Sequence, residues 1–177
     1  MRLTLLFTLL AAAAAAEVAD SSPGGFTVEI TATIQAPPAD VYRKLVHNVG
    51  EWWDPAHTFS GDARNLSIEE KPMGCFCEKL PQGGGVRHME VVYLAPGKIL
   101  RMTGAMGPMQ GLAVAGNLTF QLEAAAEGTK ITATYALAGH LANGMDTFAK
   151  PVDTMLAGQI TRLKNFAERG DPKAAVK

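Results

Sequence analysis

The chain has 177 residues, a length typical of one domain, and its apolar content of 47% is sufficient for a single hydrophobic core. Its 16 Lys and Arg residues nearly balance its 17 Asp and Glu residues. This balance excludes a strongly basic surface for nucleic acid and a polybasic segment for anionic lipid headgroups. We therefore expect no nucleic-acid partner.

Residues 1–16 have the pattern of a secretory signal peptide. Arg2 provides a positive start, residues 3–16 are uncharged and mostly apolar, and three alanines at 14–16 fit a small-residue cleavage site. We expect cleavage after Ala16 and a periplasmic or secreted protein. A spanning helix needs about 20 apolar residues, and this apolar run ends short of that at Glu17. We therefore expect no stable membrane span after cleavage.

The mature chain is predicted to begin with a flexible segment, residues 17–25. Residues 26–35 then alternate apolar and polar side chains, which predicts a strand with one buried face. Two prolines and Asp40 indicate a short helix over residues 36–48, because prolines fit a first turn and an acidic side chain there complements the helix dipole.

Trp52 and Trp53 follow that helix in a segment that we expect at the rim of a cavity. Beyond it, runs of apolar residues are separated by Gly and Pro breakers of the kind that hairpins need. These runs predict an antiparallel meander of six further strands, over residues 65–71, 74–80, 86–94, 99–105, 112–123 and 130–138.

The last predicted element is a long helix over residues 145–168, which we expect to cover the apolar face of the sheet. Its apolar side chains recur at helical spacing and form one broad stripe: Phe148, Val152, Met155, Leu156, Ile160, Leu163 and Phe166. Pro151 predicts either a kink or the start of the regular helix. Residues 170–177 are expected to be a flexible tail.

Five segments carry a resemblance to a known superfamily: residues 34–42 (IQAPPADVY), 52–53 (WW), 72–76 (PMGCF), 96–102 (PGKILRM) and 128–134 (GTKITAT). On these, the chain resembles the SRPBCC superfamily of START and Bet v 1-like helix-grip proteins, nearest to the polyketide-cyclase-like and Hsp90-ATPase-activator-homologue branch. The resemblance implies an α+β domain over residues 26–169, with a seven-stranded antiparallel curved sheet wrapped around a long C-terminal helix. It also implies a hydrophobic cavity for lipids, sterols, polyketides or other apolar ligands.

Cys75 and Cys77 are predicted to be free thiols, because residues two apart in a regular strand are too distant for a disulfide. The favoured hairpin register places both cysteines and Met89 on the cavity face, with Glu78 and His88 as a cross-strand polar pair on the other face. In the alternative register Glu78 and His88 face inward. Metal binding is a minor alternative, since a second pair of ligands is lacking.

Candidate cavity residues are aromatic, methionine, cysteine and single polar side chains: Trp52, Trp53, His57, Cys75, Cys77, Met89, Tyr93, Met102, Met106, Met109, Phe120, Tyr135, Phe148, Met155 and Gln159. Residues 104–111 are expected to form a mobile lid. The sequence has no nucleophile elbow, paired metal-ligand histidines or phosphate loop, so no cofactor or metal is predicted.

The predicted function is an exported, monomeric binding or carrier protein for an apolar small molecule. The alternative is a cyclase, dehydratase or aromatase type of enzyme that uses His57, Glu78, His88 or Tyr135 to move protons in the same cavity. At least two of these would then have to point into one cavity. A module that binds a protein partner is the third possibility.

Overall fold

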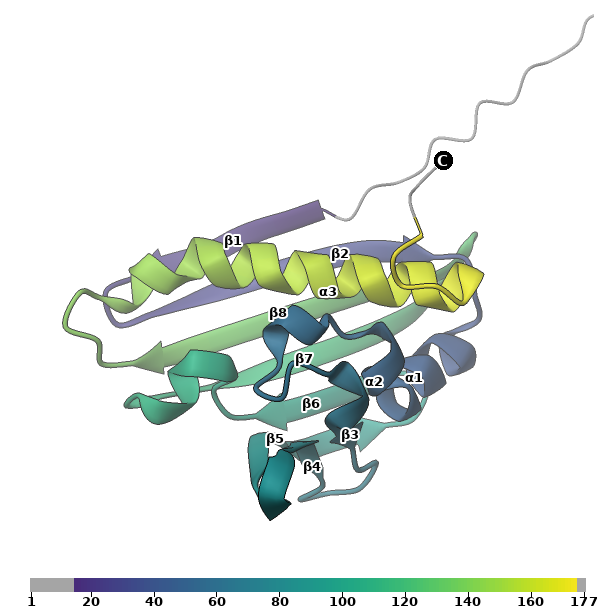
Figure 1. Cartoon of the computed structure of the whole chain (residues 1–177). Helices are drawn as coiled ribbons and strands as arrows, with labels where there is room; N and C mark the ends of the chain where they lie inside the picture. The colour runs from purple at the N-terminus through teal and green to yellow at the C-terminus, as the bar shows by residue number, and fades with distance from the viewer. Residues whose placement is uncertain (1–14, 175–177) are drawn as a thin grey trace, which may run out of the picture.

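The computed structural model describes residues 15–174, which form one antiparallel sheet with helices packed on one of its faces (Figure 1). The eight strands lie in the order β1-β2-β8-β7-β6-β5-β4-β3. Their bounds are β1 Ala15–Ser22, β2 Gly25–Ile34, β3 Leu66–Ile68, β4 Cys75–Lys79, β5 Gly85–Ala95, β6 Ile99–Thr103, β7 Val114–Ala125 and β8 Gly128–Gly139.

Three α-helices and five short 3-10 segments complete the described chain. The α-helices are α1 Pro38–His47, α2 Val49–Trp52 and α3 Ala149–Arg169. The 3-10 segments are η1 Pro55–His57, η2 Ala63–Asn65, η3 Pro81–Gly83, η4 Gly107–Gly111 and η5 Met145–Phe148. The predicted α+β class, with a curved antiparallel sheet and a long C-terminal helix, is confirmed.

All seven predicted strands are present, but the sheet has eight because β1 precedes them. Residues 17–25 are therefore not a flexible segment. β1 pairs antiparallel with β2, with Val18 opposite Val28, and Val18 packs against the core. The rest of β1 from Glu17 is acidic or small, so it lacks the alternation that indicates a strand. The predicted signal peptide falls mainly on residues 1–14, outside the described residues.

α3 packs on β1 and β2, on the same face of the sheet as α1 and α2 (Figure 1). Its stripe of Val152, Leu156, Ile160 and Leu163 is buried, as predicted. Pro151 is the third residue of α3, where a backbone N–H has no partner within the helix in any case. It therefore marks the start of the regular helix.

The beginning of the predicted flexible tail is held against α3. The helix ends at Arg169 and is capped by Gly170, whose φ of +74° is the left-handed conformation that glycine adopts without strain. The chain then turns, and the side-chain amide of Asn165 donates a hydrogen bond of 3.4 Å to the carbonyl of Pro172. Residues 170–174 are thus ordered turns, and residues 175–177 lie outside the described part of the chain.

Candidate ligand-binding pocket

A pocket of about 360 Å³ opens between the first half of α3, the loop after α2, η4, and strands β4 and β5. The loop contributes residues 53 and 56–59, and η4 contributes its first three residues and Met106 before it. The lining is mainly apolar: Trp53, Ala56, His57, Thr58, Phe59, Phe76, His88, Met106, Gly107, Pro108, Met109, Phe148, Pro151, Val152 and Met155. Its volume is within the range of small-molecule sites.

The two tryptophans have different roles. Trp52 is buried in the core, and its indole N–H donates to the carbonyls of Lys44 and Leu45. Trp53 lines the pocket, where its ring meets the edge of Phe76 at a centroid distance of 5.5 Å. The indole N–H of Trp53 donates to the carbonyl of His57 at 3.1 Å. Of the predicted pair, Trp53 is thus the cavity residue.

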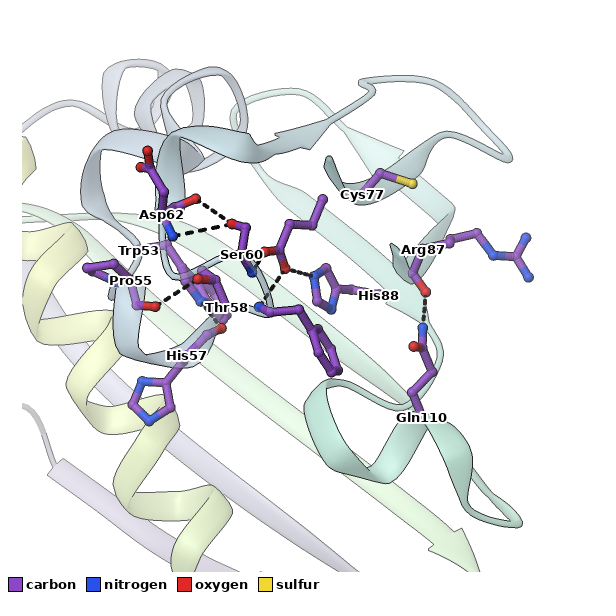
Figure 2. A network of polar contacts seen from close by, with 12 residues as sticks. Trp53, Pro55, His57, Thr58, Ser60, Asp62, Cys77, Arg87, His88 and Gln110 are labelled. Atoms are coloured by element: carbon purple, nitrogen blue, oxygen red, sulfur yellow. Dashed lines mark hydrogen bonds and ion pairs between the residues drawn. The ribbon is translucent and has the colours of Figure 1, made fainter. Parts of the chain in front are cut away.

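The predicted lid, residues 104–111, forms one wall of the pocket in this structure. Met106 and Met109 are buried in that wall. Tyr135 on β8 anchors it, because its hydroxyl accepts a hydrogen bond from the backbone N–H of Met106 and donates to the carbonyl of Gly104. The side-chain amide of Gln110 donates to the carbonyl of Arg87 on β5 (Figure 2).

The most polar part of the pocket is the pair of Glu78 and His88. His88 lines the pocket, and its Nε2 lies 2.9 Å from the carboxylate of Glu78, which is not part of the lining. Both side chains are buried, with Glu78 1% and His88 6% exposed. The carboxylate also accepts hydrogen bonds from the backbone N–H groups of Phe59 and Ser60. The Glu78 carboxylate therefore joins the loop to strands β4 and β5.

These hydrogen bonds determine the charge of Glu78. Burial favours the neutral acid, but hydrogen bonds from Ser60, Phe59 and His88 outweigh it and lower the pKa of Glu78 below its ordinary value of 4.5. Glu78 is therefore ionised near neutral pH. Tyr135 is affected in the opposite direction, because burial raises the pKa of its hydroxyl to about 12.

The observed register differs from the favoured one. A bulge in the β4–β5 ladder places Phe76 opposite Met89 and Cys77 opposite Arg87, so His88 has no directly paired partner. Phe76 and Glu78 alternate along β4 and face inward, and the bulge allows the adjacent His88 and Met89 of β5 both to be buried. The favoured register, with both cysteines on the cavity face, is wrong. Cys77 points away from the polar network in Figure 2.

Cys75 and Cys77 are joined by a disulfide, so the expectation of two free thiols is also wrong. The distance expected between residues two apart in a regular strand does not apply here, because the ladder is irregular between Phe76 and Cys77. The two Cα atoms are only 5.3 Å apart, within the normal reach of a disulfide. Neither cysteine lines the pocket.

Tyr93 is another incorrect candidate. A second irregularity, in the β5–β6 ladder between Val91 and Tyr93, keeps Val91 buried and turns Tyr93 outward with 51% of its surface exposed. There its ring lies 5.8 Å from the Arg101 guanidinium carbon. Four other candidates are buried core residues outside the pocket lining: Met89, Met102, Phe120 and Tyr135.

His57 and Gln159 form a second polar pair at the edge of the pocket. The side-chain amide nitrogen of Gln159 lies 3.1 Å from His57 Nδ1, and its amide oxygen accepts a bond from the backbone N–H of Asp54. His57 lines both the pocket and an adjacent open hollow, whereas Gln159 lines only the hollow. The structure therefore brings His57 and His88 to one pocket, together with the predicted Phe148 and Met155.

Phe59 and Phe76 line the pocket, although neither is among the candidates that the sequence predicts. Phe59 stacks on the imidazole of His88 at 5.9 Å and is 55% exposed, whereas Phe76 is buried and tilts over the same ring at 5.2 Å. A large apolar residue in the polar loop Thr58–Ser60 is the signal that would have indicated Phe59. Phe76 would be expected in the lining from a register in which its side chain on β4 faces inward.

Neither a metal-ligand cluster nor a membrane-spanning helix is found within residues 15–174. No three His, Cys, Asp or Glu side chains there are grouped to hold a metal ion. No helix in that part of the chain is both long and apolar enough to cross a membrane.

Comparison with known proteins identifies related folds. No family model matches the chain, and no curated protein matches it. An uncharacterized protein from Rhizobium leguminosarum has a TM-score of 0.60 at 19% sequence identity, covering 89% of this chain and 99% of that one.

Two further solved structures with a similar fold are of named proteins. The Aha1 dimer from Colwellia psychrerythraea has a TM-score of 0.56 at 22% identity, covering 81% of this chain and 97% of that one. CalU16 from Micromonospora echinospora has a TM-score of 0.55 at 16% identity, covering 90% and 85%. At these identities the likeness is one of fold, and it is consistent with the helix-grip architecture that the sequence resemblance predicts.

Proposed function

We propose that this protein binds a hydrophobic small molecule, of lipid-, sterol- or polyketide-like character, in the pocket beside α3. The observation that carries the proposal is the lining, which is apolar except for His57, Thr58 and His88. Such a lining provides affinity through burial of apolar surface, and a few polar groups orient the ligand. Met106, Met109 and Met155 are flexible enough to adapt to ligands of different shapes.

We further propose that the protein is an exported, monomeric carrier. The support for export is the signal-peptide pattern of residues 1–16. Light scattering of the full chain should give a mass near 18.7 kDa, and N-terminal sequencing of exported protein should begin at Glu17. A doubled mass, or a retained N-terminus, would contradict these two parts of the proposal separately.

Native mass spectrometry and a fluorescent probe test binding. Protein purified from its producing cells should carry a co-purified apolar ligand, and N-phenyl-1-naphthylamine should become fluorescent when it enters the emptied pocket. Met155→Trp should fill the pocket and weaken probe binding at least about tenfold. Met73→Trp is the matched control, because Met73 is 79% exposed and outside the pocket. Absence of both ligand and probe binding would overturn the proposal.

Catalysis of proton transfer is the second candidate function. The observation that favours it is that Glu78 and His88 are paired beside the pocket and His88 lines it. A carboxylate-held imidazole is a typical general base. The test is deuterium exchange at the α-carbon of 2-tetralone, followed by NMR. An enzyme should accelerate exchange above the buffer rate, and His88→Phe should abolish the acceleration; exchange at the buffer rate would exclude this chemistry for that probe.

A further inference from the structure

We propose that His88, held by Glu78, is a hydrogen-bond acceptor in the pocket, and that it selects apolar ligands carrying a hydroxyl group, such as phenols, enols and sterol-like alcohols. This inference rests on the proposed binding function and specifies its ligand class. It assigns to the pair a role in recognition that does not require catalysis.

The first step is the position of the imidazole proton. An ionised carboxylate can only accept hydrogen bonds. The bond of 2.9 Å between Glu78 and His88 Nε2 therefore requires a proton on Nε2. In the neutral imidazole, Nδ1 then carries the lone pair and is an acceptor.

The second step is that Nδ1 has no internal partner. No hydrogen bond joins it to any residue within the described range 15–174, and it is not among the fully buried unpaired polar atoms of that range. Since His88 lines the pocket, this nitrogen is available to a molecule inside it.

The third step is the rigidity and apolarity of the surroundings. The imidazole contacts the rings of Phe59 and Phe76, and Glu78 is fixed by two backbone N–H groups of the loop. An apolar ligand without a donor would displace water from Nδ1 and leave it unpaired, at a cost in affinity. A ligand with a hydroxyl at that end would replace the water.

Three naphthalene compounds test this selection. The Kd of 2-naphthol, 2-methoxynaphthalene and naphthalene can be measured by displacement of N-phenyl-1-naphthylamine. The naphthol should bind about tenfold more tightly than the methyl ether, which has the same rings but no donor. His88→Phe should remove this preference while naphthalene still binds. His140→Ala should retain it, because His140 is exposed and outside the pocket.

The outcomes separate the two proposals. If neither the fluorescent probe nor any naphthalene compound binds, the proposed binding function fails. If all three bind the wild type with equal Kd, only the acceptor role of His88 fails. Nitrogen-15 NMR of the wild-type imidazole adds a measurement that does not depend on a variant folding. Neutral His88 should be protonated at Nε2, with the Nδ1 resonance shifting when 2-naphthol binds; a proton on Nδ1 would overturn the inference.

Discussion

At the scale of single residues, Glu78 illustrates how a charge is kept inside an apolar region. Its carboxylate is 1% exposed, and an unpaired charge in that position would be strongly unfavourable. Two backbone N–H groups and His88 supply donors to it. The same bonds attach the loop after η1 to β4, so the residue that orients His88 also positions one wall of the pocket.

Replacement of Glu78 by Gln should make stability less dependent on acid pH. A lowered carboxyl pKa in the folded state means that the carboxylate stabilises the fold above the unfolded pKa, and that this contribution is lost as pH falls through the folded value. We expect Glu78→Gln to lower the free energy of unfolding by about 2 kcal/mol at pH 7. In urea titrations the gap between variant and wild type should shrink by pH 3; an equal gap at both pH values would contradict this.

Tyr135→Phe should loosen the η4 wall of the pocket. The variant leaves the backbone N–H of Met106 without the acceptor that it has 3.1 Å away in the wild type. A buried donor without a partner costs about 1 to 3 kcal/mol. We expect a loss of stability of that size and faster hydrogen exchange at the Met106 amide. Unchanged exchange there, with wild-type stability, would mean that the tyrosine hydroxyl does not hold this wall.

At the scale of elements, the bulge at His88 of β5, opposite Phe76 and Cys77 of β4, links two features of the site. It leaves His88 unpaired in the ladder, so that the adjacent His88 and Met89 are both buried, and it lies opposite the segment in which the Cα atoms of Cys75 and Cys77 are 5.3 Å apart. Without the bulge, the side chains beyond it would face the opposite side of the sheet. The disulfide closes a loop of only three residues, so it acts locally.

The Cys75–Cys77 disulfide predicts a defined result in mass spectrometry. Protein from an oxidising compartment should be lighter than the dithiol by two hydrogens, and should be alkylated under denaturing conditions only after reduction. Reduction should lower the free energy of unfolding by about 1.5 kcal/mol, because so short a loop restricts the unfolded chain only slightly. Two alkylations without reductant would show that the thiols are free in solution.

At the scale of the whole molecule, the pocket depends on segments far apart in sequence. Trp53 and Phe59 come from the loop after α2, Met109 from η4, and Phe148 and Met155 from η5 and α3. α3 covers one part of the sheet, and α1, α2 and the loops lie beside it (Figure 1). Because these parts meet only in the folded chain, a ligand in the pocket binds the native state alone.

Ligand binding should therefore raise global stability. At a free 2-naphthol concentration about 100 times its Kd, the free energy of unfolding should increase by about 2.7 kcal/mol. Met155→Trp should remove the increase, and Met73→Trp should keep it. Urea denaturation with and without 2-naphthol measures the effect; an equal increase in Met155→Trp would place the binding site elsewhere.

The sequence by itself determined the elements that have strong local patterns. The alternation of residues 26–35 and the stripe from Val152 to Leu163 were sufficient for β2 and α3, because the period of the apolar residues distinguishes strand from helix. The resemblance added the expectation that the sheet wraps around the long helix. β1 is not predictable in this way, because its residues 17–22 have almost no apolar pattern. Backbone pairing with β2 holds it in the sheet.

Only the tertiary structure decided which side chains reach the pocket. The burial of His88 beside Met89 depends on one irregularity in β4–β5, and the exposure of Tyr93 depends on another in β5–β6. A shift of one residue exchanges the two faces of a strand, and no local pattern in the hairpin determines such a shift. The strands that pair across each irregularity, and the loop bound to Glu78, meet only after the chain has folded.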